Sequence, residues 1–245
     1  MIPWHVGSII DEIDTSESPD DSYFAIEVEA NRFASELLMP TDWVHDQIRT
    51  SENPLDALFG IFNAAQVSLQ AASIKFINCL PSNYVIASSK GGRVDWSSRS
   101  DGTLAGMVPR GTNLASVNPF PFSCNRWTRQ LNGYSYDLWC FDVLDKLSKC
   151  DDSKPWREIL DEIVCQIIPG EPEQKRFKAS INGVTSNANG MVRRDRRPET
   201  ILSAMLQRLH ASALHDTRYA ALVSHPLFQA FCDARALDYQ SRMGL

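Results

Sequence analysis

Two polar side chains one helical turn apart, Glu27 and Asn31, are the residues of this chain best placed to do chemistry. They lie in residues 27–40, whose apolar positions recur with the period of an amphipathic helix that Pro40 ends. The other side chains on or beside the same predicted face are Ala30, Phe33, Ala34, Leu37 and Leu38. A carboxylate in line with an apolar face needs a partner, and a bound cation is one candidate. The alternative is a solvated glutamate that complements the positive end of the helix dipole.

Residues 27–44 read Glu-Val-Glu-Ala-Asn-Arg-Phe-Ala-Ser-Glu-Leu-Leu-Met-Pro-Thr-Asp-Trp-Val, and residues 67–72 read Val-Ser-Leu-Gln-Ala-Ala. Both segments resemble the ImmA/IrrE family of metallo-endopeptidases. The resemblance implies a zincin-like peptidase domain in which a helix with the motif His-Glu-x-x-His supplies two zinc ligands and a general base. It further implies that Glu27 is the third zinc ligand and that Asn31 orients Glu27 from the next helical turn. The expected partner is a protein substrate or regulator of the repressor type.

The motif His-Glu-x-x-His itself does not occur in the 245 residues. The five histidines of the chain are His5, His45, His210, His215 and His225. A catalytic zinc site needs three protein ligands, an open position for water and a base within hydrogen-bond reach. Glu27 supplies one ligand and no base. We therefore expect this chain to be inactive as a zinc peptidase on its own and to hold no zinc as it stands.

Two explanations of the missing motif remain open at this point. Residues 1–7 resemble the segment that would directly follow the motif helix, which indicates an N-terminally truncated product. The alternative is a non-catalytic homologue that kept the scaffold and serves as a protein-interaction or transcription-regulatory module. The in-frame codons upstream of Met1 would separate the two.

Composition and charge limit the remaining classes of function. The net charge is −6 and the isoelectric point is near 5.4, which argues against a general nucleic-acid or anionic-membrane binder. No apolar run is long enough to span a membrane, and no secretion signal is present, so a cytoplasmic protein is expected. Six scattered cysteines are most simply reduced thiols: Cys79, Cys124, Cys140, Cys150, Cys165 and Cys232.

Two segments have features of a nucleic-acid contact. Residues 54–79 have the outline of a helix-turn-helix, but the second helix carries a single cation, Lys75. Residues 193–197 hold four arginines around one aspartate and read as a solvated linker. Ordinary helix packing and a solvated surface are the favoured interpretations, so nucleic acid is not expected as a partner.

The hydrophobic patterns predict an α+β fold that is mostly helical. Residues 1–80 should be the C-terminal part of the peptidase-like domain, 81–145 a β-rich middle segment, and 146–245 a helical region. We expect helices at 23–38, 41–49, 54–64, 68–79, 156–168, 173–188, from 198 and from 226. A hairpin is predicted at 84–96, with a further strand near 104–108 and a long loop at 109–126. Residues 134–144 are compatible with either strand or helix.

Overall fold

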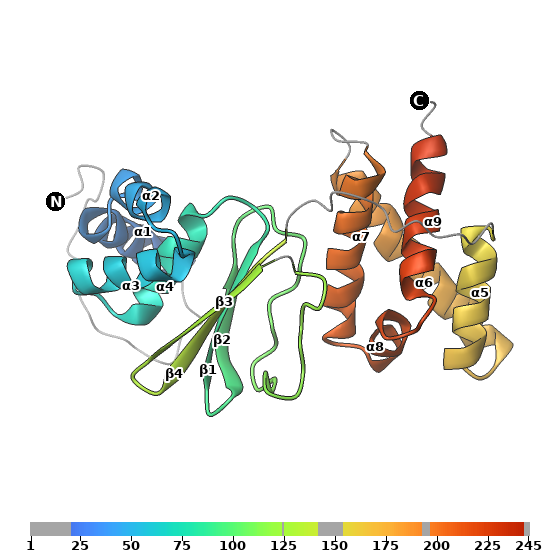
Figure 1. Ribbon diagram of the computed structural model, residues 1–245. Helices are drawn as coiled ribbons and strands as arrows, with labels where there is room; N and C mark the ends of the chain where they lie inside the picture. The colour runs from blue at the N-terminus through green and yellow to red at the C-terminus, as the bar shows by residue number, and fades with distance from the viewer. Residues whose placement is uncertain (1–20, 124, 142–153, 193–196, 243–245) are drawn as a thin grey trace.

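The computed structural model describes residues 21–123, 125–141, 154–192 and 197–242. Within these ranges four helices are followed by four strands and then by five helices, so the fold is α+β and mostly helical, as predicted. The second, third and fourth helices pack with the sheet, and the last five helices form a separate bundle beside them (Figure 1). No helix in the described part is long and apolar enough to cross a lipid bilayer.

The N-terminal helices begin and end where local signals place them. They are α1 (Asp21–Leu38), α2 (Thr41–Thr50), α3 (Pro54–Ala65) and α4 (Leu69–Cys79). The Asn53 side chain accepts a hydrogen bond from the backbone N–H of Leu55, and the Ser68 hydroxyl accepts one from Ala71 at 3.1 Å. These side chains satisfy N–H groups that the first helical turn leaves without a partner. Asn53 and Ser68 thus act as the N-caps of α3 and α4.

The four strands form one antiparallel sheet in the order β2-β1-β4-β3. Their bounds are β1 (Tyr84–Lys90), β2 (Arg93–Arg99), β3 (Asn125–Leu131) and β4 (Tyr134–Cys140). Each hairpin turns through two residues in the left-handed region: Gly91 and Gly92 join β1 to β2, and Asn132 and Gly133 join β3 to β4. Such paired left-handed residues match the twist of the flanking strands.

The two faces of the sheet have different cover. One face lies on the helices, where Ile86 and Leu138 join the cluster of apolar side chains from α2, α3 and α4. The other face carries Trp139, which packs beneath Phe120 and other residues of the segment between β2 and β3. Because strand residues alternate between faces, each central strand contributes to both clusters.

The C-terminal bundle has its own core. It comprises α5 (Trp156–Ile167), α6 (Glu171–Met191), α7 (Pro198–Ala213), α8 (Thr217–Val223) and α9 (Phe228–Ser241). Helix α7 faces the sheet-bearing part of the molecule. There the Gln207 Oε1 accepts a hydrogen bond from the Ala105 N–H at 3.1 Å, and the His210 ring lies 4.5 Å from the Phe122 ring.

Several predicted elements are wrong. Residues 104–108 are not a strand, since the N–H of Ala105 binds Gln207 and its carbonyl accepts from Arg99, so neither pairs in a ladder. Strand β3 begins inside the expected loop and was not foreseen. The helix predicted at 173–188 is, by contrast, confirmed as α6, which continues through Asn182 and Gly183 because burial of Ile181 and Thr185 outweighs the poor helix propensity of glycine.

Two smaller corrections concern the end of the chain. Helix α8 was not predicted, although the Asp216 side chain caps it by accepting from the Arg218 N–H at 2.8 Å. The last helix begins at Phe228 rather than at Pro226. The basic cluster at 193–197 lies, apart from Arg197, outside the described residues.

Candidate functional site

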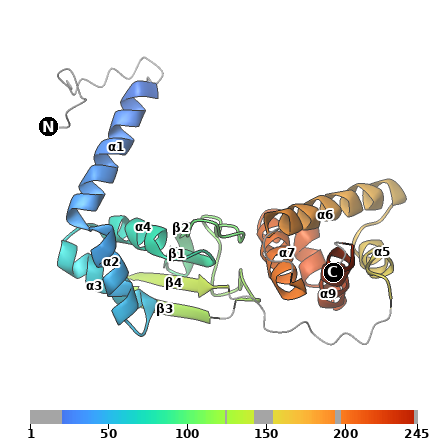
Figure 2. The ribbon, with the colours of Figure 1, turned by 90° about the horizontal axis from the view of Figure 1, so that it is seen from above.

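Helix α1, which carries the predicted zinc ligand, stands out from the rest of the molecule (Figure 2). Glu27 and Asn31 are both exposed. So are the large apolar side chains on and beside their face, with Phe33 60% and Leu37 70% exposed. This apolar face of α1 therefore packs against no core within the part of the chain that is described. The ligand role of Glu27 stays a prediction.

The C-terminal end of α1 is fixed to the fold by Glu36, which lies on the opposite side of the helix from Glu27. Its carboxylate accepts from the Lys75 ammonium on α4 and from the Thr41 N–H at 2.8 Å. Hydrogen bonding from Lys75, then from Thr41, lowers the pKa of Glu36 to about 2. Lys75, the one cation of the suspected helix-turn-helix, is thus engaged within the fold.

The described residues do not by themselves fit a zinc ion. They contain no group of three or more histidine, cysteine, aspartate or glutamate side chains placed to hold a metal. His210 lies between the rings of Phe122 and Phe228, and burial lowers its pKa to about 4. His5 lies outside the described residues. Any zinc bound at Glu27 needs ligands from outside the described part of the chain.

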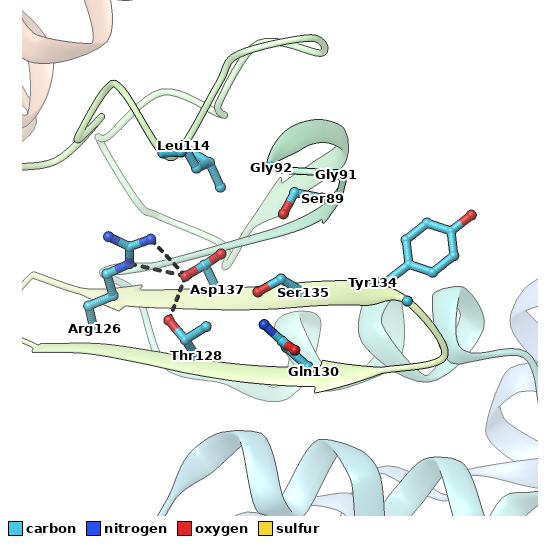
Figure 3. Close-up of a pocket in the computed structure, with 12 residues that line it drawn as sticks. Ser89, Gly91, Gly92, Leu114, Arg126, Thr128, Gln130, Tyr134, Ser135 and Asp137 are labelled. Carbon is cyan, nitrogen blue, oxygen red and sulfur yellow. Dashed lines mark hydrogen bonds and ion pairs between the residues drawn. The ribbon is translucent and has the colours of Figure 1, made fainter.

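A second candidate site is a polar hollow of about 370 Å³ on the sheet face that carries Trp139. Its floor is formed by side chains from β3 and β4, and its rim by the β1–β2 turn and the loop at Leu114 (Figure 3). The residues that line it are Ser89, Gly91, Gly92, Leu114, Ala115, Arg126, Thr128, Gln130, Gly133, Tyr134, Ser135 and Asp137.

Asp137 is the charged group at the base of this hollow, and it is only 2% exposed. Its Oδ1 accepts hydrogen bonds from Arg126 Nε at 3.0 Å, from Arg126 Nη2 at 2.9 Å and from Thr128 Oγ1 at 2.6 Å. A buried carboxylate is stable only when it is paired and hydrogen-bonded in this way. Figure 3 shows the other carboxylate oxygen turned away from Arg126.

The strand register explains why these residues meet. Thr128 lies opposite Asp137, and Gln130 lies opposite Ser135, in an uninterrupted antiparallel ladder. Opposed residues share a sheet face, so the alternate positions of β3 and β4 all point into the hollow. The Arg126 guanidinium also lies 5.3 Å from the Trp139 ring, over its face.

The hollow presents mainly uncharged hydrogen-bonding groups to a ligand. None of its lining residues is a histidine, cysteine or lysine, and its carboxylate is already engaged by an arginine. Serine, threonine and glutamine side chains offer uncharged donors and acceptors around it. The arrangement can hold a hydrogen-bonding ligand with no large net charge.

Sequence reasoning missed the hollow because it missed β3. The signal was nonetheless present in Asn132-Gly133, a pair typical of tight hairpins, between a run with Trp127 and a run with Tyr134 and Tyr136. The prolines of residues 109–126 favour a loop, and this loop assignment extended into the start of β3.

Comparisons with family models, with curated proteins and with solved structures found no match. The described residues form a mostly helical α+β protein with a projecting helix and a polar hollow. The resemblance to the metallo-endopeptidases stays a prediction that rests on residues 27–44 and 67–72 alone.

Proposed function

We propose that the N-terminal helices belong to a zinc-dependent endopeptidase of the ImmA/IrrE type that acts on a regulatory protein. In this proposal Glu27 is a zinc ligand and Asn31 orients it from the next turn. Bound zinc would supply a Lewis acid and an activated water. The remaining ligands would come from a helix outside the described residues. The domain would be inactive until that helix is in place.

The observation that carries the proposal is the arrangement of side chains around α1. Glu36 faces α4, so the opposite side of α1 is turned away from the fold. That side carries Glu27 next to Ala30 and Ala34, with Phe33 and Leu37 exposed beside them. Small residues allow a second helix to approach closely, and the large ones would be buried by it. Such a helix would bring its own side chains near Glu27.

The test is metal content. The chain is extended at its N-terminus with the residues encoded upstream in frame, and zinc is measured by elemental analysis after gel filtration. We expect near-stoichiometric zinc, and we expect Glu27→Ala to lower it. The matched control is Asp42→Ala, which removes another exposed carboxylate and should leave zinc unchanged. An extended protein that contains His-Glu-x-x-His and takes up no zinc would contradict the proposal.

The second candidate function is a non-catalytic interaction module, and the same exposed apolar side chains favour it. Here the helix that covers α1 belongs to a regulator rather than to this chain. Capture of that regulator by the present chain should persist in a chelator and should be lost in the double variant Phe33→Glu, Leu37→Glu. Capture that depends on zinc would favour the peptidase instead.

A further inference from the structure

The two edges of the sheet are treated differently by the fold. The outer edge of β2 is covered, because Val94 donates to the Thr112 carbonyl at 2.9 Å and accepts from the Gly111 N–H at 2.7 Å. The outer edge of β3 pairs with no strand among the described residues, and five of its seven residues are exposed. In Figure 2 β3 lies at the outer side of the sheet, beyond β4.

The hairpin geometry identifies which backbone groups of β3 point outward. Leu131 and Tyr134 flank the two-residue turn and form its closing hydrogen-bonded pair. Hydrogen-bonded and non-hydrogen-bonded pairs then alternate along an antiparallel ladder. The N–H and C=O groups of Arg126, Thr128 and Gln130 therefore face away from β4, where no other described strand pairs with them.

Strand β3 lacks the usual protections of an exposed edge. It contains no proline and no lysine, and its pairing with β4 has no bulge, whereas the β1–β2 pairing shifts between Ser88 and Ser89. Its two arginines are tied back onto their own chain, Arg126 to Asp137 and Arg129 to Asp56. A regular edge of this kind is a template for a further strand.

We infer that β3 pairs antiparallel with β3 of a second copy of this chain, with the two-fold axis at Thr128. The two four-stranded sheets then become one continuous sheet, and both copies bury the same edge. This inference is independent of the zinc proposal, since it uses no residue of α1.

The second copy is favoured by the self-complementary sequence of β3. Centred on Thr128, all seven residues find partners, Arg126 lies opposite the partner subunit's Gln130, and Trp127 lies opposite the partner subunit's Arg129. Centring on Arg126 instead would put two arginines directly opposite each other, which is destabilising. Centring on Gln130 would force the hairpin turn into the ladder.

The first test is a disulfide across the axis. In this register Thr128→Cys places two thiols on directly opposed residues about 5.5 Å apart between Cα atoms, which suits a disulfide. Gln130→Cys is the matched control, because its two copies are four residues apart along the ladder, about 13 Å. Under mild oxidation we expect a covalent dimer from the first variant, with a 128–128 link identified by peptide mass mapping. The mapping separates it from links through native cysteines such as the exposed Cys165.

The second test changes charge without touching the Thr128–Asp137 hydrogen bond. Gln130→Glu puts a carboxylate opposite the partner subunit's Arg126 twice per dimer, and Gln130→Lys puts an ammonium there. We expect the dimer dissociation constant from sedimentation equilibrium to fall about three- to tenfold in the first and to rise similarly in the second. The proposal is overturned if the native chain stays monomeric at every concentration reached. It is equally overturned if both substitutions leave dimerisation unchanged, or if cysteine at 130 links as readily as at 128.

Discussion

The sheet-bearing part and the C-terminal bundle both bury charged groups, but they differ in the surfaces that they leave uncovered. The first part exposes large apolar side chains on α1, among them Phe33 and Leu37, and leaves the β3 edge without a strand among the described residues. Among the described residues the bundle exposes fewer large apolar side chains, Met191 and Leu237, and its buried charged groups are held by several neighbours. Arg235 is 5% exposed, and its guanidinium lies 3.7 Å from the Trp156 ring and 4.2 Å from the Tyr239 ring.

This difference shows where the molecule is prepared to bind. Exposed apolar side chains and an open strand edge gain free energy only when another element covers them. Buried charges with several partners contribute instead to a defined packing within the bundle. We therefore expect a partner molecule to bind to the sheet-bearing part rather than to the bundle.

The largest expected effect is on stability, and it compares a buried phenylalanine of the bundle with an exposed one on α1. Phe231 on α9 is fully buried in the bundle, so Phe231→Ala should lower the free energy of unfolding by about 3–5 kcal/mol. Phe33→Ala removes the same group from an exposed helix and should change it by less than about 0.5 kcal/mol. Urea unfolding followed by circular dichroism measures both. Equal losses would break the comparison.

The next effect concerns pH and the contact between the two parts. Burial lowers the pKa of His210 from 6.5 to about 4, so the unfolded chain binds more protons between these values. Stability should therefore fall as the pH drops from about 6.5 to about 4, by up to about 3 kcal/mol. His210→Gln should flatten this dependence. Unfolding free energies measured across that pH range, with no difference between the two proteins, would contradict it.

A smaller effect is expected at the hollow. Arg126→Ala leaves the buried Asp137 carboxylate with Thr128 alone, at a cost of about 2 kcal/mol, discounted because the arginine side chain is 38% exposed. The control is Arg110→Ala, which breaks an exposed pair with Asp95 and should cost less than about 0.5 kcal/mol. Denaturation midpoints compare the two.

The smallest expected effect on stability comes from the side chains that cap the helices. The described side-chain caps of α3 and α4 have no counterpart on α5, α6, α7 or α9. Ser68→Ala should cost about 1 kcal/mol. Ser68→Asp keeps an accepting oxygen and should retain the native stability in the same thermal unfolding experiment.

The elements that sequence reasoning located are those set by local signals. Asn53-Pro54 and Ser68 mark helix starts, and Gly91-Gly92 marks a hairpin, because caps and turns depend on neighbouring residues. The hollow could not be found this way. It joins Ser89 to Arg126 and Asp137, and only the pairing of β1 with β4 brings them together.

Helix α1 shows a second feature that the sequence could not predict, namely what its apolar face contacts. Its periodicity identifies which face is apolar, yet period alone does not say what the face packs against. Helix α6 shows the reverse case, since contacts of Phe177 and Ile181 within the bundle sustain a helix that its Asn-Gly pairs disfavour.

One amide on α7 links the bundle to the mouth of the hollow. Gln207 accepts from the Ala105 N–H and its Nε2 lies 3.5 Å from Asn83 Oδ1, just ahead of β1. Residue 105 belongs to the segment that continues to Leu114 on the rim. A sliding movement of α7 therefore either carries this segment with it or breaks a buried hydrogen bond, at about 1–3 kcal/mol. We therefore expect α7 and the segment that leads to the rim to move together.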